Sequence, residues 1–297
     1  MKDIYWSRAA KLRTLERYSQ LLSGWPVPYR RTMLETCQGK TFVLDCGDPA
    51  LPPLLLFHGA YCNSLMWTRD VALWSQNFRV LSVDIIGDPG YSAPSRPAFS
   101  GDAHARWIDD IWDNLTIAKA CVVGASLGGW LALDYAARRP ERVSRLVALA
   151  PAGIVRNSLS SYFKIIPLLL LGSRGFKKAF EISFGLKYDA LSLQERAFFD
   201  FLSLVQRSVI SRTRLPTVLT DQRLRALTMP LRIVLGETDV FFDSEAVSHR
   251  LKHLLPMAEI ICIPGAGHGL TDTTALVLDF LKAPGSNENG KTSGLRP

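Results

Sequence analysis

Residues 121–129, which read Cys-Val-Val-Gly-Ala-Ser-Leu-Gly-Gly, decide the fold. They place a Gly-x-Ser-x-Gly pattern directly after a short apolar run and directly before a helix-like stretch at 127–138. A sharp strand-to-helix turn of this kind holds its central residue in a strained conformation and lifts the hydroxyl to the carboxyl edge of a sheet. The flanking glycines let neighbouring backbone approach. We therefore predict that Ser126 is a nucleophile, since helix capping alone would need neither glycine.

Short apolar runs and helix-like stretches alternate along most of the chain. The strand-like runs are 30–37, 41–46, 54–57, 80–83, 121–123, 146–150, 231–235 and 260–263, of which the first two are spaced as a hairpin. The helix-like stretches are 67–76, 104–115, 127–138, 244–255 and 270–282. Strands that are apolar throughout are buried on both faces, and their alternation with helices predicts a parallel sheet covered by helices on both sides.

One helix-rich block interrupts this alternation. Residues from about 153 to 229 contain helix-like segments, the clearest at 191–209, and we predict that they form a helical cap inserted over the sheet. The cap phenylalanines, among them Phe176, Phe180 and Phe184, either pack it on the sheet or line a pocket for an apolar acyl or aromatic group. We predict one domain over 1–297, with an amphipathic helix at about 1–23 and a loose tail at about 284–297.

A serine hydroxyl needs a base before it becomes a good nucleophile. His268 lies in a glycine-rich loop after the last strand-like run, and we predict that this flexible loop carries the imidazole to the sheet edge where Ser126 emerges. Two other histidines, His249 and His253, fall within a charged helix. His104 begins another helix, and His58 precedes a glycine in a different loop, where a structural role is expected.

The base needs a carboxylate that fixes its tautomer and stabilises its charged form. Asp239 stands just past the end of the run at 231–235, and we predict that it is this carboxylate, with Glu237 as the alternative. The resulting order of serine, aspartate and histidine is the one found on α/β-hydrolase sheets.

A tetrahedral intermediate also needs hydrogen-bond donors for its oxyanion. One candidate is the backbone N–H of Leu127, immediately after the nucleophile. The second is the backbone N–H of Ala60, in the loop after the run at 54–57, where Gly59 gives the chain room to turn. Tyr61, the next residue, is expected to contact the substrate.

Composition excludes several other classes of protein. The net charge is +8, but basic residues are scattered in stretches such as 138–145 and 207–214, which we interpret as solvated helix faces rather than a nucleic-acid site. The five cysteines lack metal-ligand spacing and predict reduced thiols in the cytoplasm. Neither a signal peptide nor a membrane span is expected. Phosphate-loop, dinucleotide and metal motifs are also missing.

The segments 58–59, 84–92, 124–129 and 265–268 together resemble the α/β-hydrolase superfamily, over about residues 25–283. The stretches 25–27, 83–88 and 236–239 are most similar to bacterial carboxylesterases of the type called carboxylesterase NP. This resemblance implies a mostly parallel eight-stranded sheet with a helical cap. It also implies hydrolysis of a small carboxylic ester through an acyl-enzyme, without a cofactor.

Other reactions use the same three side chains. Thioesterases, lactonases, C–C bond hydrolases, acyltransferases and perhydrolases remain alternatives, whereas epoxide hydrolases and haloalkane dehalogenases place a carboxylate where Ser126 stands. A ligand receptor without activity, built on the same fold, is the alternative from a different class.

Overall fold

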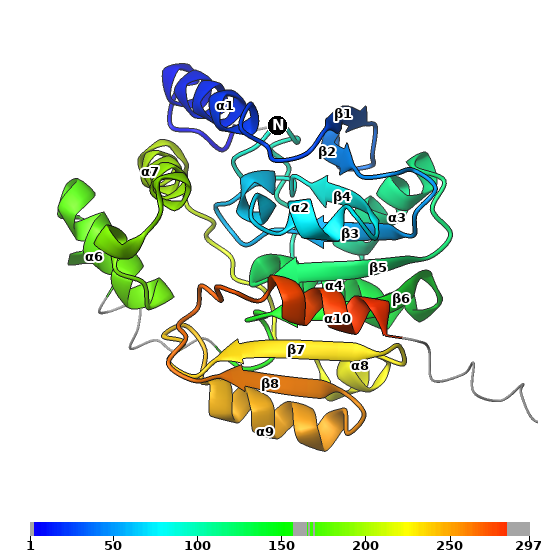
Figure 1. Cartoon of the computed structure of the whole chain (residues 1–297). Coiled ribbons are helices and arrows are strands. Elements are labelled where there is room, and N and C mark those ends of the chain that lie inside the picture. The colour runs from blue at the N-terminus through cyan, green and yellow to red at the C-terminus, as the bar shows by residue number, and fades with distance from the viewer. Residues whose placement is uncertain (1–2, 157–164, 166, 169, 284–297) are drawn as a thin grey trace, which may run out of the picture.

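The computed structural model describes residues 3–156, 165, 167–168 and 170–283. Within them, eight strands form one sheet in the order β1-β2-β4-β3-β5-β6-β7-β8 (Figure 1). The strands are β1 (Tyr29–Leu34), β2 (Thr41–Cys46), β3 (Pro53–Phe57), β4 (Arg79–Val83), β5 (Ala120–Ala125), β6 (Val143–Leu149), β7 (Leu231–Gly236) and β8 (Glu259–Ile263). Only the β1–β2 and β2–β4 pairs are antiparallel. The predicted α/β-hydrolase fold with a mostly parallel sheet is confirmed.

Helices cover both faces of this sheet (Figure 1). Those of the described residues are α1 (Arg8–Leu22), η1 (Ser64–Trp67), α2 (Val71–Trp74), α3 (Ala103–Asn114), α4 (Leu127–Arg138), η2 (Pro140–Arg142), α6 (Gly172–Phe184), η3 (Tyr188–Ala190), α7 (Leu193–Ser208), α8 (Asp221–Arg225), α9 (Ser244–Leu254) and α10 (Thr274–Lys282). Side chains of α3, α4, α8 and α9 belong to the core on one face. Those of α1, α2 and α10 belong to the core on the other.

Strand β3 shows why the apolar runs have no polar side. Leu55 and Phe57 lie in the first core, while Leu54 and Leu56 lie in the second, and all four are fully buried. Successive side chains of a strand point to opposite faces, so a strand covered on both faces must be apolar at every position. Strand β5 is likewise buried at every position, and Ser126 directly follows its last residue.

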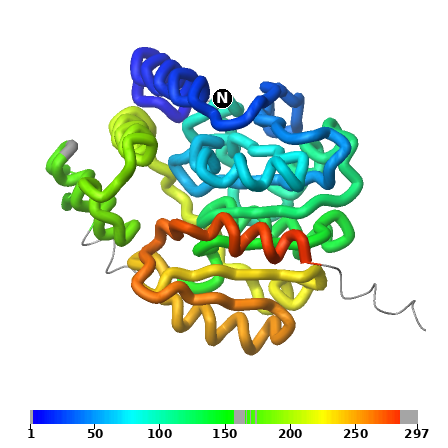
Figure 2. Tube along the Cα trace, viewed as in Figure 1, coloured from blue at the N-terminus to red at the C-terminus, as the bar shows by residue number. Residues whose placement is uncertain are grey.

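The cap helices α6 and α7 lie beyond the carboxyl ends of the central strands, beside α1 (Figures 1 and 2). Tyr5 and Val209 form an antiparallel bridge that joins the start of the chain to the segment after α7. The rings of Tyr18 in α1 and Phe201 in α7 lie 6.1 Å apart between their centroids. The N-terminal helix and the cap therefore pack as neighbours.

Parts of three predicted segments lie outside the described residues. These are the expected loose tail at 284–297, residues 1–2 of the expected N-terminal helix, and residues 157–164, 166 and 169 of the expected cap.

Some element boundaries differ from the sequence-based ones because of local turns and helix caps. Strand β1 ends at Leu34 because Thr36 begins a turn, in which its hydroxyl accepts the Gln38 N–H. The stretch expected as one helix at 67–76 is divided into η1 and α2, and the Asn63 side chain caps η1. Helix α10 begins at Thr274 rather than at residue 270, because Asp272 has a left-handed backbone (φ 60°).

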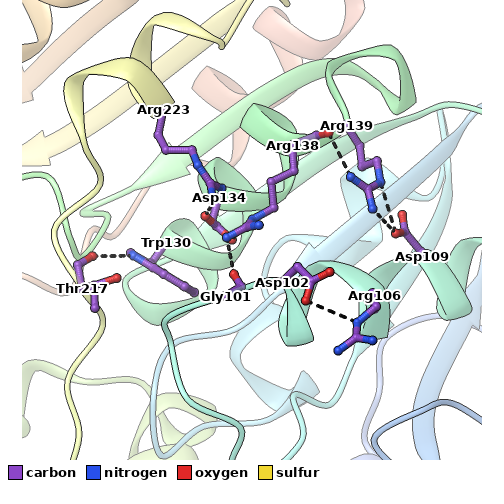
Figure 3. A network of polar contacts seen from close by, with 10 residues as sticks. All are labelled: Gly101, Asp102, Arg106, Asp109, Trp130, Asp134, Arg138, Arg139, Thr217 and Arg223. Carbon is purple, nitrogen blue, oxygen red and sulfur yellow. Dashed lines mark hydrogen bonds and ion pairs between the residues drawn. The ribbon is translucent and has the colours of Figure 1, made fainter.

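The prediction that the basic stretches are solvated helix faces was wrong for several arginines. Arg138 binds Asp134, and only 15% of its side chain is exposed (Figure 3). Arg139 binds Asp109 in the same region. Arg212, in the other stretch, is only 9% exposed and pairs with a fully buried carboxylate, that of Asp88. Much of the positive charge is therefore neutralised within the fold.

Candidate active site

The turn from β5 into α4 holds Ser126 in a conformation that L residues rarely adopt, with φ 52° and ψ −109°. Both flanking glycines are required by close backbone contacts. A Cβ atom at Gly124 would lie 2.2 Å from the Gly128 carbonyl oxygen, and one at Gly128 would lie 2.0 Å from the Phe57 carbonyl oxygen. The Ser126 side chain makes no capping bond to α4. The hydroxyl is therefore presented away from the helix. The Gly-x-Ser-x-Gly pattern follows from close packing of Gly124 against the start of α4 and of Gly128 against the end of β3.

Ser126, His268 and Asp239 come together at the carboxyl edge of the sheet, although each was predicted from a different segment. The Ser126 Oγ lies 3.0 Å from His268 Nε2, and His268 Nδ1 lies 2.8 Å from Asp239 Oδ2. The Asp239 side chain is only 2% exposed and that of His268 12%. These contacts form a continuous path of hydrogen bonds from a hydroxyl to a buried carboxylate.

The second oxygen of Asp239 is also held. Its Oδ1 accepts hydrogen bonds from the backbone N–H groups of Phe241 (2.8 Å) and Phe242 (3.3 Å). The alternative acid, Glu237, points elsewhere, because its Oε2 accepts the Gly265 N–H at 2.8 Å. The geometry therefore favours Asp239 over Glu237 as the partner of the imidazole.

Aromatic side chains surround the imidazole of His268. The ring centroids of Phe241 and Phe242 lie 4.9 and 5.5 Å from that of His268, and the Phe184 ring of the cap lies 6.5 Å away. An apolar shell excludes water, and charges and hydrogen bonds within it interact more strongly than in solvent.

The loop after β3 reaches Ser126. A Cβ atom at Gly59 would lie only 3.7 Å from Ser126 Cβ. The next residue, Ala60, has a backbone N–H without an acceptor among the described residues. Leu127 is the first residue of α4, where a helix leaves its N–H without an internal partner. Two backbone N–H groups thus belong to segments that adjoin Ser126, and their role as oxyanion donors stays a prediction.

The side chain of Tyr61 is hydrogen-bonded to the cap segment. Its phenolic oxygen accepts the Arg212 N–H at 2.9 Å, and its own N–H donates to Asp88 Oδ1 at 3.3 Å. Arg212 in turn donates to Asp88 Oδ2 at 3.0 Å. The sequence did not single out Arg212 or Asp88, and substrate contact by Tyr61 stays a prediction.

The structure places His58 in a supporting position, as expected. Its Nδ1–H donates to the Gly59 carbonyl at 2.8 Å, and its Nε2 accepts the Ile85 N–H at 2.9 Å. Burial lowers the pKa of His58, which keeps the ring neutral for these two bonds. The ring therefore connects the loop after β3 to the loop after β4.

The other histidines lie elsewhere. His249 and His253 are exposed on α9. His104 is buried between the rings of Phe99 and Trp130, and burial lowers its pKa to about 4. Within the part of the chain that the structure describes, no group of three or more His, Cys, Asp or Glu side chains could hold a metal ion.

Comparison with protein families and curated proteins shows what the chain as a whole is similar to. Residues 54–279, about three quarters of the chain, match the profile of the alpha/beta hydrolase family. The chain is 33% identical over 266 residues to the uncharacterized carboxylesterase nap of Bacillus subtilis. This alignment covers 88% of this chain and 87% of the relative. It is 32% identical over 263 residues to the carboxylesterase YbfK of the same organism, with 88% of both chains covered.

Solved structures show the same similarity in three dimensions. The carboxylesterase CesB (YbfK) from Bacillus subtilis superposes with a TM-score of 0.79 at 31% identity, over 92% of this chain and 99% of that one. The naproxen esterase (carboxylesterase NP) from Bacillus subtilis superposes with a TM-score of 0.78 at 31% identity, over 93% of this chain and 95% of that one.

Proposed function

We propose a catalytic mechanism for this chain, which belongs to the alpha/beta hydrolase family and is a serine hydrolase of carboxylic esters. The resemblance to this family predicted from the sequence is confirmed. The observation that carries the assignment of residues is the pair of hydrogen bonds, 3.0 and 2.8 Å long, that links Ser126 through His268 to Asp239.

In the first half of the reaction, Ser126 Oγ attacks the ester carbonyl carbon while His268 Nε2 takes the hydroxyl proton. Asp239 stabilises the imidazolium through the bond at Nδ1. The Leu127 and Ala60 N–H groups donate to the oxyanion of the tetrahedral intermediate. The imidazolium then gives its proton to the departing alcohol oxygen, and the C–O bond of the ester breaks. The acyl group remains on Ser126.

In the second half, water takes the place of the alcohol. His268 removes one proton from this water as its oxygen attacks the acyl carbon, and the same two backbone donors hold the new oxyanion. Collapse of the intermediate returns the proton to Ser126 Oγ and releases the carboxylic acid. The enzyme ends as it began, without a cofactor in the reaction.

The proposal extends to substrate contact and cell compartment. We assign a small-molecule ester as substrate, with Tyr61 at its binding site, because Tyr61 adjoins the Ala60 donor. We also assign the enzyme to the cytoplasm, because Cys37, Cys46, Cys62, Cys121 and Cys262 are all free thiols. No helix among the described residues is long and apolar enough to cross a membrane.

The mechanism is tested by turnover of p-nitrophenyl esters and by labelling with a fluorophosphonate. Ser126→Ala is expected to lower kcat by a factor on the order of 10⁴–10⁶. Stoichiometric labelling should map to Ser126 by peptide mass spectrometry. The control is Ser144→Ala, which alters a serine hydrogen-bonded to Cys121 at the start of β6 and should leave both readouts unchanged. Ser126→Ala activity within tenfold of wild type, or labelling elsewhere, would refute the assignment.

A further inference from the structure

The last turn of cap helix α6 contacts His268. The His268 N–H donates to the Ser183 carbonyl at 3.0 Å. That carbonyl belongs to the final turn of a helix, where internal donors run out and another segment must supply one. The Phe184 ring meets the imidazole edge to face, at 73° between the planes. The proposed base is therefore held by backbone and side chain of the cap.

Two glycines of the histidine loop fit against the same turn. A Cβ atom at Gly267 would lie 2.7 Å from the Phe184 carbonyl carbon and 2.8 Å from the Gly185 nitrogen. One at Gly269 would lie 2.1 Å from Phe184 Cδ1. The sequence suggests that these glycines make the loop flexible. Instead, they allow close packing, because α6 occupies the space that side chains would fill.

The first half of the loop is fixed to the sheet domain. The Gly265 N–H donates to Glu237, and the Thr238 N–H donates to the Ala266 carbonyl at 2.9 Å. A Cβ atom at Gly236 would lie 2.2 Å from the Gly267 carbonyl oxygen. From Gly267 onward the loop also contacts the cap, so that His268 lies between Asp239 of the sheet and the last turn of α6.

Phe184 is itself held within an aromatic cluster of the cap. Its ring stacks on that of Phe180, with 4.3 Å between centroids and 15° between planes. Phe180 meets Phe199 of α7 at 4.7 Å, and Phe199 lies 5.3 Å from Phe176. A shift of α7 would therefore reach His268 through a continuous series of ring contacts.

We infer that the last turn of α6 orients the imidazole of His268, with Phe184 as a positioning residue. This inference rests on the proposed function, because it assigns His268 as the base. A displacement of the cap would withdraw both the Ser183 carbonyl and the Phe184 ring. The fraction of molecules with His268 aimed at Ser126 would then fall, so the position of the cap and the rate of the chemical step are coupled.

The test compares Phe184→Ala with Phe176→Ala. The two residues lie on the same helix, are both half-buried and both belong to the aromatic cluster, but only Phe184 contacts the histidine loop. With p-nitrophenyl acetate, Phe184→Ala should lower kcat about 10- to 100-fold, because small misplacements of a catalytic group are costly. KM should change less than about threefold. Phe176→Ala should stay within about twofold of wild type in kcat.

A double substitution measures the contact itself. Gly269→Ala introduces a methyl group that meets the Phe184 ring, and should lower kcat on its own. In the Phe184→Ala background the 2.1 Å contact with Cδ1 is removed and only a 3.0 Å approach to the Cβ atom at 184 remains, so the loss of kcat caused by Gly269→Ala should be at least about threefold smaller. Equal losses in both backgrounds, or equal losses for Phe184→Ala and Phe176→Ala, would overturn the inference.

Failure of this inference can be told apart from failure of the mechanism. If wild-type Ser126 is not labelled by the fluorophosphonate, the mechanism itself is wrong. If Ser126 is labelled in wild type and at the same rate in Phe184→Ala, only the positioning role is wrong. Should Phe184→Ala not fold, Phe184→Leu keeps apolar volume, and it must still show a loss of kcat larger than that of Phe176→Leu.

Discussion

The Glu237 carboxylate accepts a 2.8 Å hydrogen bond from the Gly265 N–H, although the carboxylate that binds the imidazole belongs to Asp239, only two residues later. One short loop after β7 therefore does two separate tasks. Glu237 fixes the start of the histidine loop, and Asp239 fixes the ring that the loop carries.

Asp239→Asn and Glu237→Gln should separate these tasks. An amide at 239 cannot stabilise the imidazolium and favours the wrong tautomer, so kcat should fall by a factor on the order of 10³–10⁴. An amide at 237 keeps an oxygen that accepts the Gly265 N–H, so kcat should stay within about fivefold. Steady-state kinetics on one activated ester provides the measurement. A larger loss of kcat in Glu237→Gln than in Asp239→Asn would show that Glu237, rather than Asp239, is the carboxylate that supports the imidazole.

Ser126→Gly should stabilise the protein relative to Ser126→Ala. Both variants lack the proposed nucleophile, but only glycine relieves the positive φ at this position. The free energy of unfolding should be about 1–2 kcal/mol higher for Ser126→Gly. Urea denaturation of the two inactive variants measures the difference. Equal midpoints would mean that the turn carries no strain.

The positions of the strands and of the three main site residues could be predicted from the sequence because each leaves a local signal. β3 and β5 are apolar at nearly every position, and Ser126 stands between glycines that its turn requires. Asp239 lies in the loop after β7 and His268 in the loop after β8, the last two strands of the sheet. In each case the type and order of a few neighbouring residues are enough to predict the position.

Contacts made by the inserted cap could not be predicted in this way. Asp88 and Arg212 are 124 residues apart, and neither stands in a pattern that names the other. Likewise, nothing near Ser183 indicates that its carbonyl meets His268. The pairing of Arg138 with Asp134 was different, since an i, i+4 spacing in a helix is a visible signal.

Arg212→Met tests the buried ion pair that binds the cap to the loop after β4. Removing the cation leaves Asp88 buried and without its charged partner, which should lower the free energy of unfolding by about 3–5 kcal/mol. The double variant Asp88→Asn, Arg212→Met should recover at least half of this loss, because no buried charge remains. Chemical denaturation of the four proteins in the cycle gives the coupling. Strictly additive effects would argue against a direct interaction.

Asp70 should make the stability of the protein depend on pH. Burial raises its pKa to about 6, against an ordinary value of 3.8, despite a hydrogen bond from the Thr274 hydroxyl and the nearby Arg69. Between pH 3.8 and pH 6 the folded state binds more protons than the unfolded state. The contribution of Asp70 to the free energy of unfolding is therefore complete below pH 3.8 and is lost as the pH rises through 6.

Asp70→Asn removes this dependence while keeping an acceptor for Thr274. The difference in unfolding free energy between the variant and wild type should therefore grow in favour of the variant by about 2–3 kcal/mol from about pH 4 to about pH 7.5. Denaturation at both values measures it. A difference that does not change with pH would show that Asp70 ionises normally in the folded protein.

The bridge between Tyr5 and Val209 has a consequence for engineering. A chimera that exchanged only residues 153–229 with a relative would leave the new helices beside a foreign α1. Residues 3–22 should be exchanged together with that block. The unit to exchange when substrate preference is to be altered therefore consists of two segments of sequence that are separated by more than a hundred residues.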